Sequence, residues 1–130
     1  MEKIDKERIV NLGEVKTPQG TVDDILDLFK DINYKSRFFE PGCGDGNFLT
    51  EILLRKLEML SKHQDFKDNI KQNYIEIPEF KIIITVASIY GVDIDSENIT
   101  KSQKRMKKIV IDFYKKKLKT KIVPEYFENI

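Results

Sequence analysis

The segment EPGCGDGNF, residues 40–48, has glycines at three alternate positions and constrains the fold of this chain more than any other feature. A short apolar stretch precedes it, and an amphipathic run with Phe, Leu and Ile at helical spacing follows it. The pattern predicts a strand over 37–40, a glycine loop, and a helix from Asn47 to about Ser61. Glycines at such a junction remove Cβ atoms and permit positive φ, so a ligand can lie against main-chain N–H groups.

The spacing of the glycines narrows the kind of ligand. A dinucleotide-binding loop has the pattern G-x-G-x-x-G, which Gly42 and Gly44 fit, but the third glycine comes one residue early, at Gly46. A P-loop is excluded because no Gly-Lys-Ser/Thr sequence follows. The loop therefore suits a nucleoside ligand that lacks a pyrophosphate.

A second element, YGVDID, ends a predicted strand over Ile89–Ile94. An acid at the end of such a strand can accept hydrogen bonds from the two ribose hydroxyls of a nucleoside. Asp93 and Asp95 point to the same face, and Ile94 between them is available to lie on an adenine. We expect Tyr90 to pack between the sheet and a helix.

The glycine loop and Asp93 lie further apart in the sequence than the about 20 residues usual between such a loop and a ribose-binding acid. Residues 62–80 are polar and predict an irregular surface insertion, which would loop out without moving the second strand. Over Pro78–Ser88 both helix and strand stay open, although the β-branched residues of Ile82–Val86 favour a strand.

Two further helices flank these elements. Thr17 is the expected N-cap of a helix whose first residue is Pro18. Asp95 or Ser96 is expected to cap a last, lysine-rich helix that runs to about Lys119, and we interpret its basic face as solvent-facing rather than as a phosphate-binding surface. Strands that alternate with helices predict an α/β fold with a parallel sheet of Rossmann type.

The composition indicates one domain or part of one, in 130 residues with 23 basic and 22 acidic side chains. One cysteine and one histidine exclude an internal disulfide and a structural zinc site, so no metal ligands are expected. No signal-peptide pattern or long apolar run is present, so we expect a cytoplasmic chain with no membrane partner. We divide the chain into four segments. Residues 1–16 are an N-terminal arm with a short helix over 4–12, and residues 17–61 hold the Thr-Pro helix, the first strand and the glycine loop with its helix. Residues 62–80 are the insertion, and residues 81–130 hold the second strand and the basic helix.

Three motifs together resemble those of the S-adenosylmethionine-dependent DNA adenine-N6 methyltransferases of bacterial restriction–modification systems. PGCGDGNF is close to the glycine-loop motif of that family, GEVKTPQGTVDDIL to its Thr-Pro motif, and SIYGVDIDSENI to its ribose-acid motif. They occur in the family's order over residues 13 to about 106. The resemblance implies a partial Rossmann-like class I methyltransferase fold, truncated before the later strands.

The resemblance also implies a role for each matching residue in binding S-adenosylmethionine. Asp93 would hold the ribose hydroxyls, Ile94 would pack on the adenine, and Cys43 would be a small packing residue under the loop. Thr17 and Pro18 would line the methionine end of the cofactor, and Glu40 would face its ammonium group. Gly42, Gly44 and Gly46 would let the loop pass close to the cofactor.

The catalytic motif of that family, (Asn/Asp/Ser)-Pro-Pro-(Tyr/Phe), is absent, because none of the four prolines at 18, 41, 78 and 124 is adjacent to another. The resemblance therefore implies a cofactor-binding portion that has no catalytic residue, is inactive alone, and meets DNA only within the complete enzyme. A sheet of two or three strands would leave an unpaired edge and exposed apolar faces, so we expect self-association or a complementing C-terminal chain.

Two alternatives stay open. The chain could be a non-catalytic remnant or interaction module that keeps the fold without binding a cofactor. A methyltransferase for another substrate is a weaker alternative, because the Thr-Pro motif ahead of the glycine loop argues against it.

Overall fold

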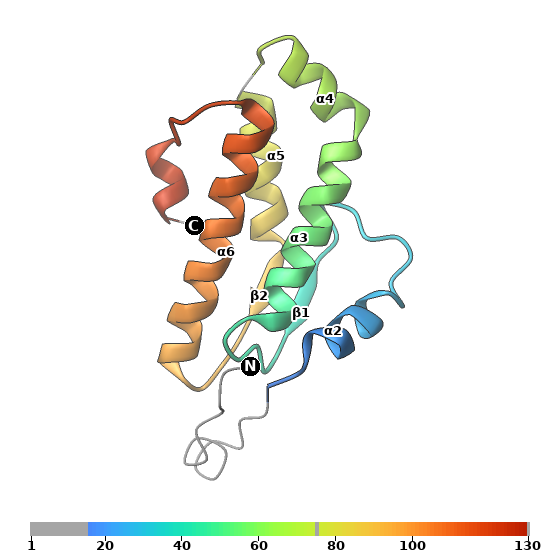
Figure 1. The fold of residues 1–130 in the computed structure, drawn as a ribbon, viewed down its shortest axis with the longest axis vertical. Coiled ribbons are helices and arrows are strands. Elements are labelled where there is room, and N and C mark those ends of the chain that lie inside the picture. The colour runs from blue at the N-terminus through green and yellow to red at the C-terminus, as the bar shows by residue number, and fades with distance from the viewer. Residues whose placement is uncertain (1–15, 75, 130) are drawn as a thin grey trace.

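The computed structural model describes residues 16–74 and 76–129, so the predicted helix over 4–12 lies outside the described residues. Within the described residues the chain is an α/β structure with two parallel strands and five α-helices (Figure 1). The elements, in order, are α2 (Gln19–Leu26), β1 (Phe38–Glu40), α3 (Asn47–Lys62), α4 (Gln64–Lys71), α5 (Glu76–Ala87), β2 (Ile89–Gly91), α6 (Ser96–Leu118) and the 3-10 helix η1 (Glu125–Asn129).

The two strands pair in parallel, with Phe39 beside Tyr90 at the centre of the register. Main-chain bonds continue past the strand ends: Val92 N–H donates to the Glu40 carbonyl, and Cys43 N–H donates to the Val92 carbonyl, each at 3.0 Å. The predicted parallel pairing is confirmed, and the second strand is shorter than the predicted Ile89–Ile94. The continued pairing brings the glycine loop beside the turn that follows β2.

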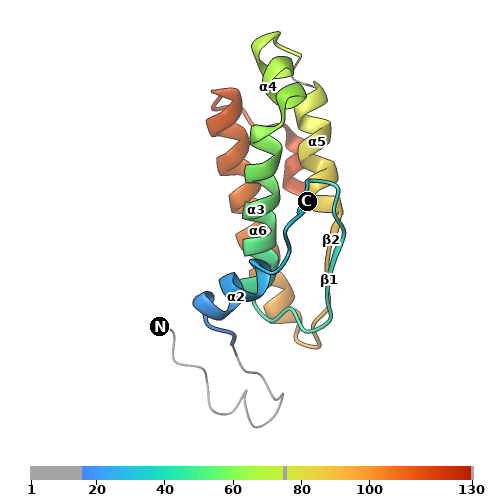
Figure 2. The same cartoon turned by 90° about the vertical axis from the view of Figure 1, so that its right-hand side faces the viewer.

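The described helices cover one face of this sheet. Helix α3 packs on that face, where Phe38 and Ile89 contact Val22, Leu26 and Ile52. Figure 2 shows the strands at one side of the molecule, with the helices on the other side of them. On the opposite face Phe39 is 65% exposed and Tyr90 is 52% exposed. The expectation that Tyr90 packs between sheet and helix is therefore wrong, because its side chain points to the uncovered face.

The buried members of the main core all lie on helices, and Ile89 of β2 packs against them. These members, which lie on α3, α4, α5, α6 and η1, are Leu53, Leu57, Leu60, Phe66, Ile82, Val110, Tyr114 and Phe127. The C-terminal η1 lies beside α6, where the ring of Phe127 is 5.1 Å from that of Tyr114 (Figure 1). Glu79 on α5 accepts hydrogen bonds from the hydroxyls of Tyr114 and Tyr126, which joins three elements.

One expectation for the middle of the chain is wrong, and the choice between helix and strand left open over Pro78–Ser88 is answered by helix α5. The irregular insertion expected over 62–80 is wrong: among its described residues, Lys62 ends α3, Gln64–Lys71 form α4 and α5 begins at Glu76. Phe66 of α4 is fully buried in the main core. The segment favoured as a strand, Ile82–Val86, belongs to α5, where Ile82 and Thr85 are fully buried. Burial against neighbouring helices outweighs the weak strand preference of β-branched residues. Pro78 lies in the first turn of α5, where its missing N–H costs no intrahelical bond.

The caps of the two outer helices differ from each other. Thr17 is not the N-cap of α2, because the helix begins at Gln19 and Pro18 is its N-cap, in an extended conformation and without a side-chain cap bond. Asp95 is the N-cap of α6, as one of the two alternatives had it, and its carboxylate accepts from Glu97 N–H at 2.9 Å. A carboxylate there satisfies a free donor of the first turn and suits the helix dipole.

A lysine lies fully buried beneath the strands. Lys56 on α3 donates to the Ser36 carbonyl and to the Ser88 hydroxyl, in the segments that lead into β1 and β2. Its ammonium also lies 5.8 Å from the ring centre of Phe38. Burial lowers the pKa of Lys56 to about 8, because the charged form loses its hydration.

We predict that the free energy of unfolding of the chain increases at alkaline pH because of Lys56. Above pH 8 the folded amine loses its proton, while the unfolded amine keeps its proton up to its ordinary pKa of about 10.4. The unfolded state then binds more protons, so the free energy of unfolding should increase by roughly 1 to 2 kcal/mol between pH 8 and pH 10. Urea unfolding over this range should show the rise in the wild type and its loss in Lys56→Met. The exposed Lys62→Met on the same helix should keep the rise, and the same rise in Lys56→Met would contradict the assignment.

Candidate functional site

The candidate site lies where β1 and β2 end at the same edge of the sheet. Glu40 is the last residue of β1, the glycine loop follows it, and Asp93 comes just after β2. Asn47 begins α3 directly after the loop, so the N-terminus of that helix also lies at this edge. Ligands of open parallel α/β sheets bind outside the carboxyl ends of strands in this arrangement.

The three glycines of the loop have different structural causes. Gly46 has a φ of 100° and is the N-cap of α3, and a Cβ built there would lie 2.8 Å from Cβ of Ser102 on α6. Gly44 has a φ of 55°, which also favours glycine. A Cβ built on Gly42 would meet no atom within 4 Å, and its φ lies outside the left-handed region. The packing of the described residues therefore gives no reason for glycine at position 42.

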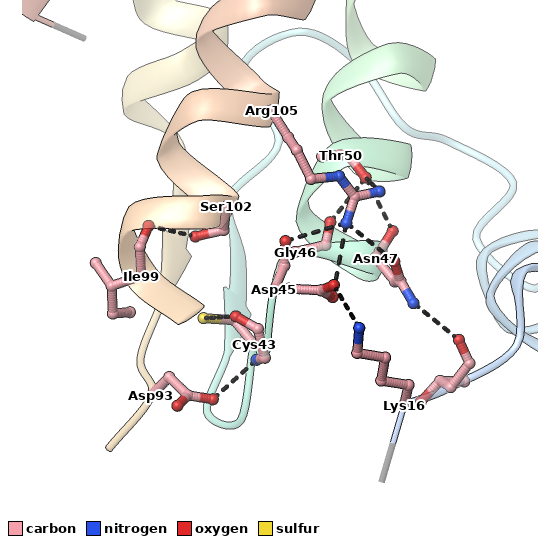
Figure 3. A network of polar contacts seen from close by, with 12 residues as sticks. Lys16, Cys43, Asp45, Gly46, Asn47, Thr50, Asp93, Ile99, Ser102 and Arg105 are labelled. Atoms are coloured by element: carbon pink, nitrogen blue, oxygen red, sulfur yellow. Dashed lines mark hydrogen bonds and ion pairs between the residues drawn. The ribbon is translucent and has the colours of Figure 1, made fainter. Parts of the chain in front are cut away.

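Asp93 joins the glycine loop to the turn after β2. One carboxylate oxygen accepts from Gly44 N–H at 2.9 Å (Figure 3). The other accepts from Asp95 N–H at 2.8 Å. Glu40 likewise accepts from Gly42 N–H at 3.2 Å. Asn98 Nδ2 also donates at 3.5 Å to the Asp93 oxygen that accepts from Asp95. An ionised carboxylate has about four lone-pair sites, so Glu40 and the Asp93 oxygen bound by Gly44 keep capacity for a further donor.

The rim beside Asp93 is apolar. Ile94 is 83% exposed, and Val92 is also exposed. Below the loop, Cys43 is buried beside Gly91, and a Cβ at Gly91 would lie 3.1 Å from Cβ of Cys43. Burial raises the pKa of the Cys43 thiol, and the charge of Asp93 adds to this effect. A buried thiol with a raised pKa agrees with the expected packing role and does not suit a nucleophile.

The Thr-Pro segment is held close to the glycine loop. Asn47 donates from Nδ2 to the Thr17 carbonyl at 3.1 Å, and Lys16 lies 3.1 Å from Oδ2 of Asp45 (Figure 3). The structure therefore brings Thr17 to the loop through its main chain. Pro18 is exposed, and it serves as the N-cap of α2.

Sequence reasoning missed the polar network around this loop, which consists of Lys16, Asp45, Asn47, Thr50 and Arg105. Arg105 on α6 donates to the loop at 3.0 Å and was assigned to a solvated basic face. One signal was available in the sequence, because Arg105 is the one arginine of the lysine-rich helix. Arginine, unlike lysine, presents a rigid planar fork of donors.

Comparison of the chain with family models, with curated proteins and with solved structures finds no match. Among the described residues, no group of three or more His, Cys, Asp or Glu side chains is placed to hold a metal ion. No helix within 16–74 and 76–129 has both the length and the apolar character needed to cross a membrane.

We predict that two glycines of the same loop respond differently to an added methyl group. Gly46→Ala should destabilise the fold by about 2 kcal/mol or more, because the new Cβ meets α6 and the φ is left-handed. Gly42→Ala, its matched control, should unfold within about 0.5 kcal/mol of the wild type. Urea denaturation measures both values. Equal losses in the two variants would contradict this account of the loop.

Proposed function

We propose that this chain is the S-adenosylmethionine-binding portion of a DNA adenine-N6 methyltransferase with a Rossmann-like sheet. One observation carries the proposal: the structure brings Glu40, the glycine loop and Asp93 together at one sheet edge and ties the Thr17 main chain to the same loop. When bound, the cofactor supplies an electrophilic methyl group on its sulfonium. No residue of this chain is proposed as catalytic, and the cytoplasmic location stays a prediction.

The chemistry of the site residues fits this cofactor. Glu40 supplies a negative charge for the ammonium of the methionine end, and Asp93 supplies acceptors for the ribose hydroxyls. Ile94 offers an apolar surface for the adenine ring, and its side chain is exposed. The open space around Gly42 leaves room for a ligand against the loop. These residues bind and orient the cofactor, and none of them moves a proton.

A second candidate function has its own support. Asp93 already accepts two main-chain N–H groups, a role that would hold the loop in shape even without a ligand. A non-catalytic interaction module that binds no cofactor would use Asp93 for this purpose alone. The glycine at position 42 favours the cofactor-binding function, because a structural turn does not require glycine there.

The uncovered sheet is the observation that suggests a partner segment. Within the described residues β1 and β2 pair only with each other, so each leaves an unpaired edge, and Phe39 and Tyr90 lie exposed on one face. Parallel strands are ordinarily covered on both faces. We propose that a further polypeptide segment extends this sheet and supplies the catalytic and DNA-recognition parts, and that the isolated chain associates with itself through the same face. DNA is then a partner of the complete enzyme only.

Calorimetric titration with S-adenosylmethionine and S-adenosylhomocysteine tests the cofactor function. We expect both ligands to bind the wild type, Ile94→Ser to bind more weakly, and Gly42→Ala to fold normally but bind at least about tenfold more weakly, a loss of about 1.4 kcal/mol. Gly20→Ala is the matched control, because a Cβ there also meets no atom within 4 Å and Gly20, on α2, is not one of the proposed cofactor-binding residues. A folded wild type that binds neither ligand would favour the interaction module.

Sedimentation velocity over a concentration series tests the uncovered face. We expect the isolated chain to self-associate and the double variant Phe39→Ser, Tyr90→Ser to shift towards monomer, because two adjacent aromatic side chains leave the exposed face. Tyr74→Ser, an equally exposed aromatic position away from the sheet, should associate as the wild type does. A wild type that is monomeric at every concentration would contradict self-association through this face.

A further inference from the structure

Arg105 reaches from α6 to the glycine loop (Figure 3). Its Nη1 donates to the Asp45 carbonyl and to Oδ1 of Asn47, each at 3.0 Å, and lies 3.6 Å from Oδ1 of Asp45. Its Nη2 donates to the Thr50 hydroxyl at 3.4 Å. The guanidinium has five donors in a fixed plane, so this one side chain holds the loop and the first turn of α3 together.

The contact with Asn47 has a directional consequence. An arginine has no acceptor, so the amide oxygen of Asn47 must face the guanidinium. The amide nitrogen of Asn47 is then turned the other way, and it donates to the Thr17 carbonyl at 3.1 Å. Arg105 therefore selects the orientation of the Asn47 amide that holds the Thr-Pro segment. A charge-assisted bond at one end of such a chain also polarises and strengthens the next bond.

Asp45 forms a second connection between the same three segments. Its carboxylate lies 3.1 Å from Lys16 Nζ and 3.6 Å from Arg105 Nη1, and its side chain is only 17% exposed. The loop is thus held between a cation that precedes α2 and a cation on α6. Two connections in parallel, through Asn47 and through Asp45, fix where the Thr-Pro segment sits relative to the loop.

We infer that Arg105 is a positioning residue, which sets the Thr17–Pro18 segment against the glycine loop and so shapes the methionine end of the proposed cofactor site. The inference rests on the proposed function and extends it to a residue outside the three motifs. Arg105 touches no proposed ligand group and acts through Asn47 and Asp45.

A role in helix packing alone does not account for these contacts. Helix α6 already packs on α3 through Ser102 against Gly46, and Val110 lies fully buried in the main core. The guanidinium instead donates to one loop carbonyl and to two side chains of the first turn of α3. Lysine cannot reproduce this arrangement, because it is a point charge without a planar fork.

The test combines ligand titration with hydrogen exchange on the same full chain. Arg105→Gln should bind S-adenosylhomocysteine about tenfold more weakly and exchange faster over 16–26 and 40–48, and Arg105→Lys should recover only part of the affinity. Asn47→Asp keeps the acceptor for Arg105 but loses the donor to Thr17, so it should loosen 16–26 and leave 40–48 protected. Lys107→Gln is the control, because Lys107 lies on the same helix and pairs with Glu128 instead.

The outcomes separate this inference from the proposed function. Weaker binding and faster exchange in Arg105→Gln, with Lys107→Gln unchanged, support the inference. Affinity within twofold of the wild type, or unchanged exchange over 16–26, overturns it. If the wild type binds neither ligand, the proposed function fails and the cofactor part of the inference fails with it. The exchange data then still decide whether Arg105 positions the Thr-Pro segment.

Discussion

The parallel pairing of β1 with β2 is the constraint on which the candidate site depends. The strands are short, yet their hydrogen bonds continue through Val92 and Cys43 into the segments that follow. That continuation places a carboxylate oxygen of Asp93 2.9 Å from the Gly44 nitrogen, although the two residues are far apart in the sequence. Without the pairing, the loop after one strand and the acid after the other would have no fixed relation.

The structure fixes the two ends of this pairing by different means. At the start of the strands, buried Lys56 joins Ser36 and Ser88, an arrangement that costs hydration of the ammonium. At the far end, charged groups that are partly exposed hold the glycine loop, with Arg105 on one side and Lys16 on the other. Helices α3, α5 and α6 pack together behind both ends of the strand pair. The candidate site is therefore held by packed helices even though the sheet has one uncovered face.

The parts of the fold that sequence predicts well are those with strong local signals. The glycine loop between Glu40 and Asn47, the helix after it and the capped start of α6 all follow from residue type and spacing. Residues 62–80 were predicted wrongly, and Pro78–Ser88 stayed open between helix and strand, because helix formation there depends on burial against distant helices, which a local pattern does not report. Arg105 was missed for a related reason, since a side chain on a basic helix acquires its role only from what the fold brings opposite it.

The glycine at position 42 distinguishes between two explanations of the loop, a structural turn and a ligand-binding loop. A turn between a strand and a helix requires glycine where φ is left-handed or where a neighbour leaves no room, and Gly46 meets both conditions. Gly42 meets neither, while its N–H donates to Glu40 and its Cα faces open space. Asp93, by contrast, serves the loop whether or not a ligand is present. Because packing does not require glycine at position 42, Gly42 supports the proposed cofactor site more strongly than Asp93 does.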